Sequence, residues 1–189
     1  IYETEEVVCS GNIGTPVLDT LKKRQDISIV ELSSFHLEHI KNLKSDIGVL
    51  LNVEQDHLDR HHSFGSYKKV KEKVLFGCSV GLTVKEILLS IDSIGEQIFS
   101  FEDLTKPFEK EIYNLFKNKW PHHEILNIQA VLSVVLVFEA LKNKKASSEV
   151  LVEQPDLINK CAEALITFKR LKHRFEILGA HNGLTYIND

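Results

Sequence analysis

Acidic and imidazole side chains follow two apolar segments of the sequence. Glu31 lies at the end of the β-branched segment ISIVEL, and Asp56, His57 and Asp59 come directly after the apolar segment DIGVLLNV. Both segments have the composition of buried parallel strands, and ligands bind beyond the carboxyl ends of such strands. Carboxylates with one histidine suit Mg²⁺, which keeps several waters and takes few protein ligands beside substrate phosphates. The pattern therefore predicts a cation site that includes Glu31 and His57.

Two other interpretations of the second segment remain open at this stage. In one, Asp56 caps a following helix and His57 only packs against its neighbours. In the other, the order D-H-x-D-x-H-H indicates a zinc hydrolase whose ligands would be Asp56, His57, Asp59, His61 and His62. Adjacent histidines point in different directions, and the sequence has no second histidine-rich group to complete the coordination. Zinc is therefore the weaker interpretation.

The composition is that of an ordinary globular domain. The chain has 189 residues, of which 43% are hydrophobic and 26% are charged, enough for one core. A net charge of −4 gives no electrostatic reason to expect a nucleic acid or a membrane as partner, and it favours small-molecule substrates. The three cysteines are widely spaced and form no C-x-x-C pair, which indicates a reducing cytosol.

The elements that must position these residues follow a β-α-β order. Apolar and β-branched runs predict strands at 6–10, 27–32 and 46–53, and amphipathic patterns predict helices at 17–26, 33–43 and 63–76. This order is typical of an α/β fold with a parallel, doubly wound sheet. Lys68, Lys69 and Lys73 are expected on a solvated helix face.

Further along, the chain gives two clear signals. Residues 125–141 are apolar but shorter than a membrane span of about 20 residues and contain polar positions, so they predict a buried helix. Near the C-terminus, an Asn-Gly pair between two β-rich runs predicts a hairpin. Residues 78–120 carry no recognisable chemical motif.

Six motifs, taken in order, resemble the Mur ligases, and within them the branch that adds D-glutamate. They are GNIGTP (11–16), VELSSFHLE (30–38), LNVEQDHLDRH (51–61), YKKVK (67–71), HRFE (173–176) and YIND (186–189). The resemblance implies a P-loop NTPase-like central domain with a mostly parallel, doubly wound sheet flanked by helices. It places the ATP-binding domain at 1–170 and the start of a D-glutamate-binding domain, a short β-hairpin, at 171–189.

The resemblance also implies a reaction and roles for individual residues. ATP would phosphorylate UDP-N-acetylmuramoyl-L-alanine, and D-glutamate would then displace phosphate from the acyl phosphate, in the cytoplasm. Lys71 would be carbamylated by carbon dioxide and would hold Mg²⁺ together with Glu31 and His57. Asn12 and Ser33 would lie near the muramoyl substrate. The nucleotide would lie among Asn127, Arg174 and Asp189.

Several departures from the family pattern bear on activity. The phosphate loop G-x-x-x-x-G-K-[ST], which the family places before GNIG, does not occur in this chain, so the chain by itself is expected to be inactive. Glu124 stands where the family has an asparagine, and His36 stands where it has a glutamine. Two alternatives follow: a related amide ligase such as a folate polyglutamating enzyme, and a ligase-like binding domain without catalysis.

Overall fold

The structure is a computed structural model, and it describes residues 5–12, 14–22, 24–91, 97–116, 124–147, 156–168 and 176–188. The chain divides into two compact units, Ile1–Pro155 and Asp156–Asp189. The second unit begins earlier than the predicted functional boundary after residue 170. That boundary separates two binding roles, which contacts within the chain do not test, so it stays a prediction.

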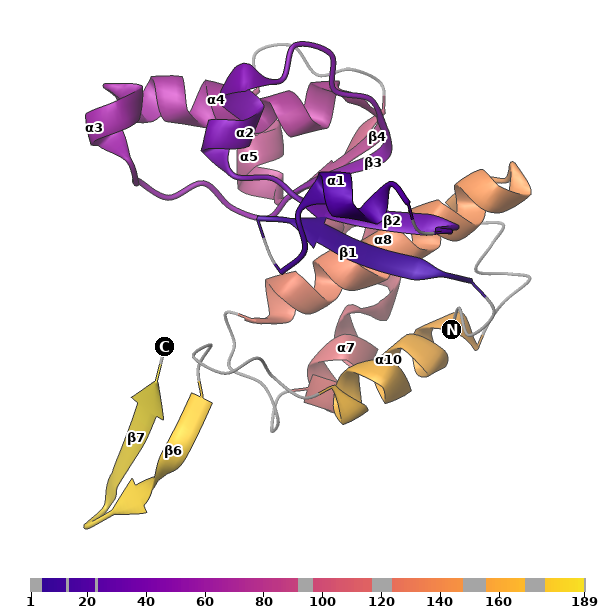
Figure 1. The fold of residues 1–189 in the computed structure, drawn as a ribbon. Helices are drawn as coiled ribbons and strands as arrows, with labels where there is room; N and C mark the ends of the chain where they lie inside the picture. The colour runs from indigo at the N-terminus through magenta and orange to yellow at the C-terminus, as the bar shows by residue number, and fades with distance from the viewer. Residues whose placement is uncertain are drawn as a thin grey trace. The chain divides into compact units, whose positions relative to one another are not determined.

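The first unit is built on parallel strands in two sheets (Figure 1). Strand β1 (Val7–Gly11) pairs with β2 (Ile27–Glu31), and the second sheet has the order β3 (Ser45–Leu50), β4 (Cys78–Thr83), β5 (Ile98–Ser100). Helices connect the strands, as the β-α-β pattern requires. The predicted α/β class with parallel strands and flanking helices is confirmed.

Strand β2 differs from its prediction in one respect. It was expected to be buried on both faces, but Ile29 is 55% exposed and Val30 is 39% exposed. Among the described residues β2 pairs only with β1, because β3 belongs to the other sheet. The apolar composition of β2 shows that the strand could be buried on both faces. In this two-stranded sheet, however, part of β2 remains exposed.

The helices that follow β1, β2 and β3 carry the residues of interest. They are α1 (Val17–Thr20), α2 (Ser34–His39), α3 (Leu58–His61) and α4 (Phe64–Phe76). The first two are shorter than predicted; α2 ends because Ile40 is already in an extended conformation. Ser63 caps α4 by accepting a hydrogen bond from the Ser66 N–H, and the predicted extent of α4 is confirmed.

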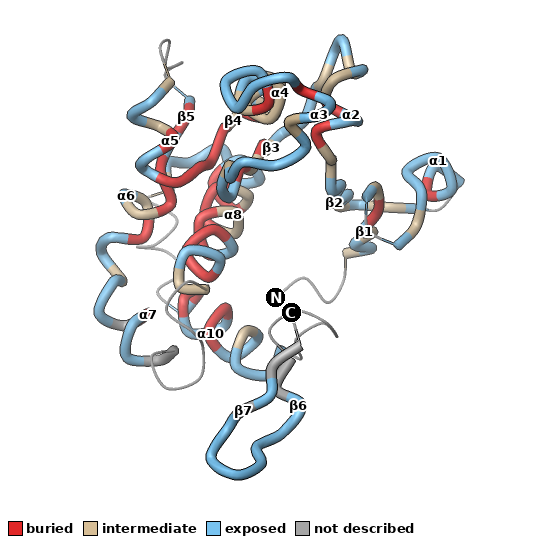
Figure 2. Tube along the Cα trace, turned by 90° about the vertical axis from the view of Figure 1, so that its left-hand side faces the viewer, coloured by how far each residue is buried: buried red, intermediate tan, exposed pale blue. Residues whose placement is uncertain are grey.

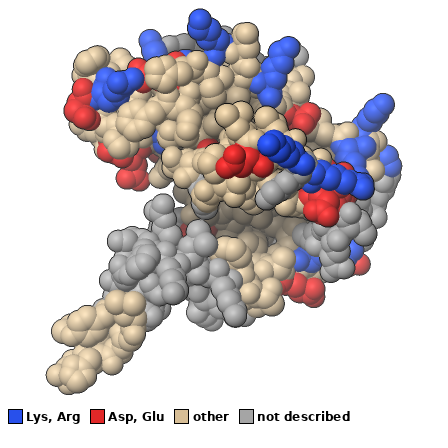
Figure 3. Space-filling view, in the orientation of Figure 1, with Lys and Arg blue, Asp and Glu red and all other residues tan. Residues whose placement is uncertain are grey.

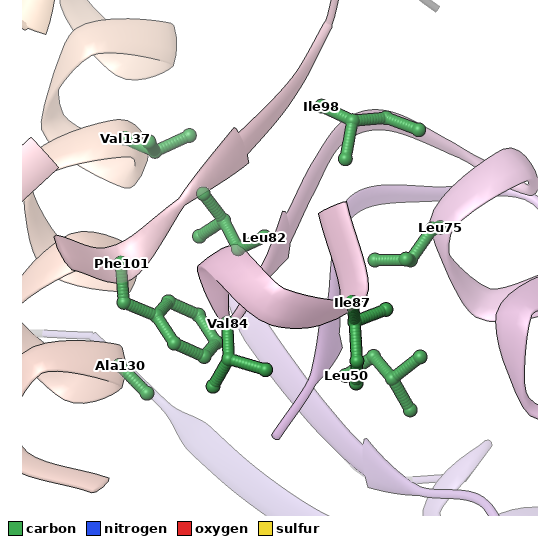
Figure 4. Packing of buried hydrophobic residues seen from close by; sticks show 9 residues of the cluster. All are labelled: Leu50, Leu75, Leu82, Val84, Ile87, Ile98, Phe101, Ala130 and Val137. Atoms are coloured by element: carbon green, nitrogen blue, oxygen red, sulfur yellow. The ribbon is translucent and has the colours of Figure 1, made fainter. Parts of the chain in front are cut away.

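The hydrophobic core lies between the three-stranded sheet and its helices. Leu82 on β4 and Phe101 are both 0% exposed and pack with Leu50, Leu75 and other apolar side chains (Figure 4). The tube in Figure 2 is buried in the second half of β4 and at many positions in the middle of α8 (Ile125–Asn143). The remaining elements of this unit are α5 (Lys85–Leu89), α6 (Phe101–Thr105), η1 (Lys106–Phe108) and α7 (Glu109–Phe116).

Helix α8 is long and apolar enough to cross a membrane by length and composition alone. Its Ala130 and Val137 belong to the hydrophobic core, and half of its most apolar window is buried inside the protein. Gln129 is also buried and donates a 3.1 Å hydrogen bond to the Thr105 hydroxyl. The apolar residues of α8 thus pack inside the protein, and the prediction of a buried helix is confirmed.

One close approach places α4 against the sheet. A side chain at Gly48 on β3 would bring its Cβ within 2.1 Å of the Val74 carbonyl oxygen on α4. Only glycine therefore allows the helix backbone to lie this close to the strand. The register of α4 on β3 fixes where the lysines and Tyr67 of that helix stand.

The second unit contains α10 (Leu157–Thr167) and a hairpin of β6 (Glu176–His181) and β7 (Leu184–Asn188). Asn182 and Gly183 connect the two strands with φ values of 50° and 77°. Positive φ at both central residues is the requirement of the tightest hairpin turns, which Asn-Gly satisfies. The predicted hairpin is confirmed.

Candidate functional site

The loop after β3 presents His57 at the start of α3 in a left-handed conformation, with φ 49° and ψ 37°. The His57 N–H donates a 2.7 Å hydrogen bond to Oδ1 of Asp56, and the ring Nε2 lies 3.4 Å from Oδ2 of the same carboxylate. No side chain caps α3, so the alternative in which Asp56 caps this helix is wrong. The His57 side chain is 45% exposed, which leaves it open to a ligand.

His57 and Lys71 each approach the ring of Tyr67, which is 4% exposed. The Lys71 Nζ lies 5.3 Å from the centre of this ring, and the His57 ring lies 6.5 Å from it in an edge-on orientation. Tyr67 and Lys71 are four residues apart on α4 and therefore share a face of the helix. A cation held at an aromatic face has a defined position. The buried ring is thus a neighbour of two of the predicted metal ligands.

Glu31, the third predicted ligand, is held by the glycine-rich turn after β1. The Asn12 amide Nδ2 donates to Oε1 of Glu31 at 3.3 Å, and the Asn12 backbone N–H donates to the Glu31 carbonyl oxygen at 2.9 Å. Gly11 has φ 104°, and a Cβ there would lie 2.2 Å from the same carbonyl oxygen. The glycine is therefore required for the turn to lie directly on Glu31.

Ser33 is the N-cap of α2 and forms a reciprocal pair with His36. The His36 N–H donates to Ser33 Oγ at 3.3 Å, while the Ser33 N–H donates to Nδ1 of His36 at 3.2 Å. The Ser33 hydroxyl also lies 2.8 Å from Nδ1. This is the geometry of a capping box, in which glutamine or glutamate ordinarily takes the place of the ring. The imidazole of His36 therefore takes the part of glutamine or glutamate in holding Ser33.

Two residues of α3 tie it to α2. His61, 5% exposed, places Nε2 3.1 Å from Ser34 Oγ, and its ring lies against Phe35 and Tyr67. Arg60 donates to Oε2 of Glu38 through Nε at 3.2 Å and Nη2 at 3.0 Å. The hydrogen bond from Arg60 holds the pKa of the Glu38 carboxyl below its ordinary value.

The position of His61 decides against the zinc hydrolase. A ligand for zinc would have to face the other ligands, but His61 is buried and bonded to Ser34. Within the described part of the chain, no three His, Cys, Asp or Glu residues gather as a metal site would require. The zinc interpretation is therefore wrong for these residues.

The lysines of α4 are only partly a solvated face. Lys69 is exposed as predicted, but the Lys73 Nζ donates to the Leu37 carbonyl oxygen at 2.9 Å, near the C-terminal end of α2. Lys68 donates to Ser90 Oγ at 2.6 Å and lies 3.6 Å from Glu72. The prediction holds for Lys73, which is exposed although it makes this hydrogen bond, and it is wrong for Lys68, whose side chain is only 23% exposed because it reaches Ser90 and Glu72.

Only one of the three residues predicted to bind the nucleotide lies among the described residues. Asn127 is exposed in the first turn of α8, whereas Arg174 and Asp189 lie outside the described residues. The predictions also missed Phe35 and Tyr67, whose rings pack against His57. The four-residue spacing of Tyr67 and Lys71 could have indicated that Tyr67 lies beside Lys71 on α4. No pattern in the sequence indicated that Phe35 lies near His57.

On the face in Figure 3, basic and acidic side chains are interspersed. That distribution agrees with the small net charge of −4.

Comparison with known proteins places the chain in a family. The family model of the Mur ligase middle domain matches residues 12–182. The UDP-N-acetylmuramoylalanine–D-glutamate ligase of Saccharophagus degradans is 34% identical over 190 residues, covering 97% of this chain and 41% of that protein. Ligases of the same name from Buchnera aphidicola of Acyrthosiphon pisum (strain Tuc7) and from Pseudothermotoga lettingae are 33% and 32% identical, each over 95% of this chain.

The chain spans about two fifths of the length of these curated relatives, 41%, 41% and 40% respectively. The matched region contains the turn at Asn12, the two loops at Glu31 and His57, and helix α4 with Lys71. The match of the family model to most of the chain, together with these relatives, shows that the chain belongs to the Mur ligase middle-domain family.

Proposed function

We propose that the intact protein is an ATP-dependent ligase of the cytoplasm that joins D-glutamate to UDP-N-acetylmuramoyl-L-alanine through an acyl phosphate. The names of the relatives support this substrate pair, since they are UDP-N-acetylmuramoylalanine–D-glutamate ligases. The observation that carries the proposal is the placement of both His57 and Lys71 next to the buried Tyr67 ring.

Lys71 is the proposed site of carbamylation. The neutral Nζ attacks the carbon of carbon dioxide, an N–C bond forms, one proton leaves to solvent, and the product is an anionic carbamate. This change turns a cation into an oxygen donor on the helix whose Tyr67 ring also neighbours His57. Oxygen donors with one imidazole fit Mg²⁺.

The donor set fits a metal role for Glu31, His57 and Lys71. Asn12 holds the Glu31 carboxylate, Asp56 holds the backbone of His57, and Tyr67 holds the Lys71 side chain. Mg²⁺, when bound, would neutralise the charge shared by ATP and the attacking carboxylate. The residues themselves contribute by orienting their oxygen and nitrogen donors before substrate arrives.

The remaining roles follow the same arrangement. Asn12 and Ser33 lie at the turns that begin after β1 and β2, and we assign them to the muramoyl substrate. The Ser33 hydroxyl is fixed by His36, so it is oriented before binding. We assign Asn127, Arg174 and Asp189 to the nucleotide, with ATP as substrate.

The deciding experiment follows phosphate release by the intact protein with ATP, Mg²⁺, UDP-N-acetylmuramoyl-L-alanine and D-glutamate. We expect release to need all four and to be lost in Lys71→Ala but kept in Lys69→Ala, because Lys69 is an exposed neighbour on the same helix. Intact mass should show one added carbon dioxide in the wild type, lost on acidification and absent from Lys71→Ala.

The acceptor arm of the experiment separates the alternatives. Phosphate release with a folate and glutamate, but none with the muramoyl substrate, would replace the proposal by the related amide ligase. No release with either acceptor, while ATP still binds, would favour the non-catalytic binding domain.

A further inference from the structure

We propose that His61 is a positioning residue, whose buried hydrogen bond to Ser34 fixes α3 and through it the His57 imidazole. The inference deepens the proposed function and rests on it in one respect, the assignment of His57 as a metal ligand. His61 itself touches neither substrate nor metal in this scheme. It acts by holding the turn on which His57 stands.

The turn needs such support because its backbone is strained at both ends. Helix α3 is a single turn of 4 residues, too short to be stable by itself. The residues that flank it, His57 and His62, both have left-handed conformations, with φ of 49° and 64°. This conformation is uncommon outside glycine, although Asn, Asp and His adopt it more often than other residues, and contacts with the surrounding structure help to hold it.

His61 makes the buried contacts of this turn. Its ring is 5% exposed, and Nε2 lies 3.1 Å from Ser34 Oγ, so the polar tip is paired inside the protein. The second tether, between Arg60 and Glu38, is about half exposed on its Arg60 side. Exposed ion pairs of this kind hold a geometry weakly. The buried pair of His61 and Ser34 is therefore the main attachment of α3 to α2.

The two imidazoles also share the same aromatic neighbours. The Phe35 ring centre lies 5.9 Å from that of His61, nearly parallel to it, and 5.0 Å from that of His57. The Tyr67 ring lies 5.2 Å from His61 and 6.5 Å from His57. A shift of the His61 ring would therefore also shift the His57 ring, both through the backbone of α3 and through the Phe35 and Tyr67 rings that the two imidazoles contact.

This arrangement joins two loops that the proposed reaction uses together. Ser34 follows the proposed substrate residue Ser33, and His61 lies four residues after the proposed metal ligand His57. The hydrogen bond between them spans 27 residues of sequence. It sets the distance between the turn after β2 and the turn after β3.

The test compares His61→Phe and Ser34→Ala with the control His62→Asn in the intact protein. Phenylalanine keeps a ring of similar volume against Phe35 but removes the nitrogen, and Ser34→Ala removes only the partner oxygen. His62 is an exposed neighbouring imidazole, and asparagine tolerates its left-handed backbone.

The first readout is the nuclear Overhauser effect between the ring protons of His57 and Phe35. It needs no metal and therefore stays informative even if the metal proposal fails. We expect it in the wild type and in His62→Asn, and we expect its loss in His61→Phe and Ser34→Ala. Wild-type intensity in both variants would overturn the inference. If His61→Phe does not fold, Ser34→Ala, which removes one oxygen, decides.

The second readout is the affinity for Mn²⁺ alone, measured from the free ion by electron paramagnetic resonance. We expect affinity to fall about tenfold in His61→Phe and Ser34→Ala, the size of effect seen when a ligand loses its supporting partner. His57→Ala serves as the reference. Unchanged affinity in His57→Ala would refute the metal role, whereas a loss there with wild-type affinity in His61→Phe and Ser34→Ala would refute the positioning role alone.

Discussion

The side-chain amide of Asn12 donates a 3.3 Å hydrogen bond to Oε1 of Glu31, and the backbone N–H of Asn12 donates a 2.9 Å hydrogen bond to the Glu31 carbonyl oxygen. The glycine-rich turn after β1 is thus built onto the residue that ends β2. Parallel pairing makes this possible because Gly11 lies opposite Glu31 in the register of the two strands. The turn is a support for a carboxylate as well as a connection between elements.

A first prediction concerns Gly11. Its φ is 104°, and a Cβ at this position would lie only 2.2 Å from the Glu31 carbonyl oxygen, so there is no room for a side chain. We expect Gly11→Ala to lower the free energy of unfolding by about 1–3 kcal/mol, the cost of one strained backbone position. Urea denaturation measures this. The control is Gly65→Ala in α4, where no atom lies within 4 Å, and the helix should be unchanged or stabilised by up to about 1 kcal/mol.

A second prediction concerns the Tyr67 ring. If the ring face is what places Lys71, Tyr67→Phe should keep most of the phosphate release, because it keeps the face and the buried volume. Tyr67→Leu should lower phosphate release strongly, since it removes the surface shared by Lys71 and His57. Measurement of kcat and the apparent Mg²⁺ requirement would separate the two variants. Equal activity of Tyr67→Phe and Tyr67→Leu would show that the ring only fills space in the core and does not place Lys71.

A third prediction concerns the cysteines. Burial raises the pKa of the Cys161 thiol to about 11, and Cys161 is 3% exposed, whereas Cys9 is exposed. Only the thiolate is alkylated, so iodoacetamide at about pH 8 should modify Cys9 first and Cys161 last. Mass spectrometry of peptides against time measures the order. Similar rates at both thiols in the folded protein would contradict the burial of Cys161.

A fourth prediction concerns stability in acid. A hydrogen bond from Lys85 is the largest cause that holds the pKa of Asp103 below its ordinary value, and the two side chains lie 2.8 Å apart. A carboxyl whose pKa is depressed in the folded state contributes stability above its unfolded pKa and loses it as pH falls through the folded pKa. Stability should therefore decline below about pH 4, the ordinary range of aspartate.

The variant Lys85→Met removes the donor, so its stability should depend less steeply on pH in that range. Lys69→Met, on an exposed position of α4, serves as the control and should follow the wild type. Urea unfolding at a series of pH values measures both. Parallel curves for Lys85→Met and the wild type would show that this pair adds nothing to the acid response.

Several elements followed from local sequence because their signals are local. The residues from Ser63 onward predicted α4 because their apolar positions repeat at helical spacing, and in the structure Ser63 caps this helix. The pair Asn182 and Gly183 predicted the hairpin because few residues accept two successive positive φ values. The position of Glu31 at the end of β2 followed from the β-α-β order in the same way, whereas β3 ends at Leu50 and His57 stands at the start of α3.

Other features depend on which distant segments meet, and no local pattern records that. His61 and His62 are neighbours of the same type, yet only His61 is buried and bonded to Ser34, 27 residues away. Lys68 was predicted on a solvated helix face, but its side chain is only 23% exposed because it reaches Ser90, 22 residues away. The sequence by itself determined the element types and the candidate residues, because backbone propensity and hydrophobic period act over a few positions. The tertiary structure decided which imidazole is buried, which lysine lies on an aromatic face and which strand stays exposed, because those outcomes depend on long-range packing.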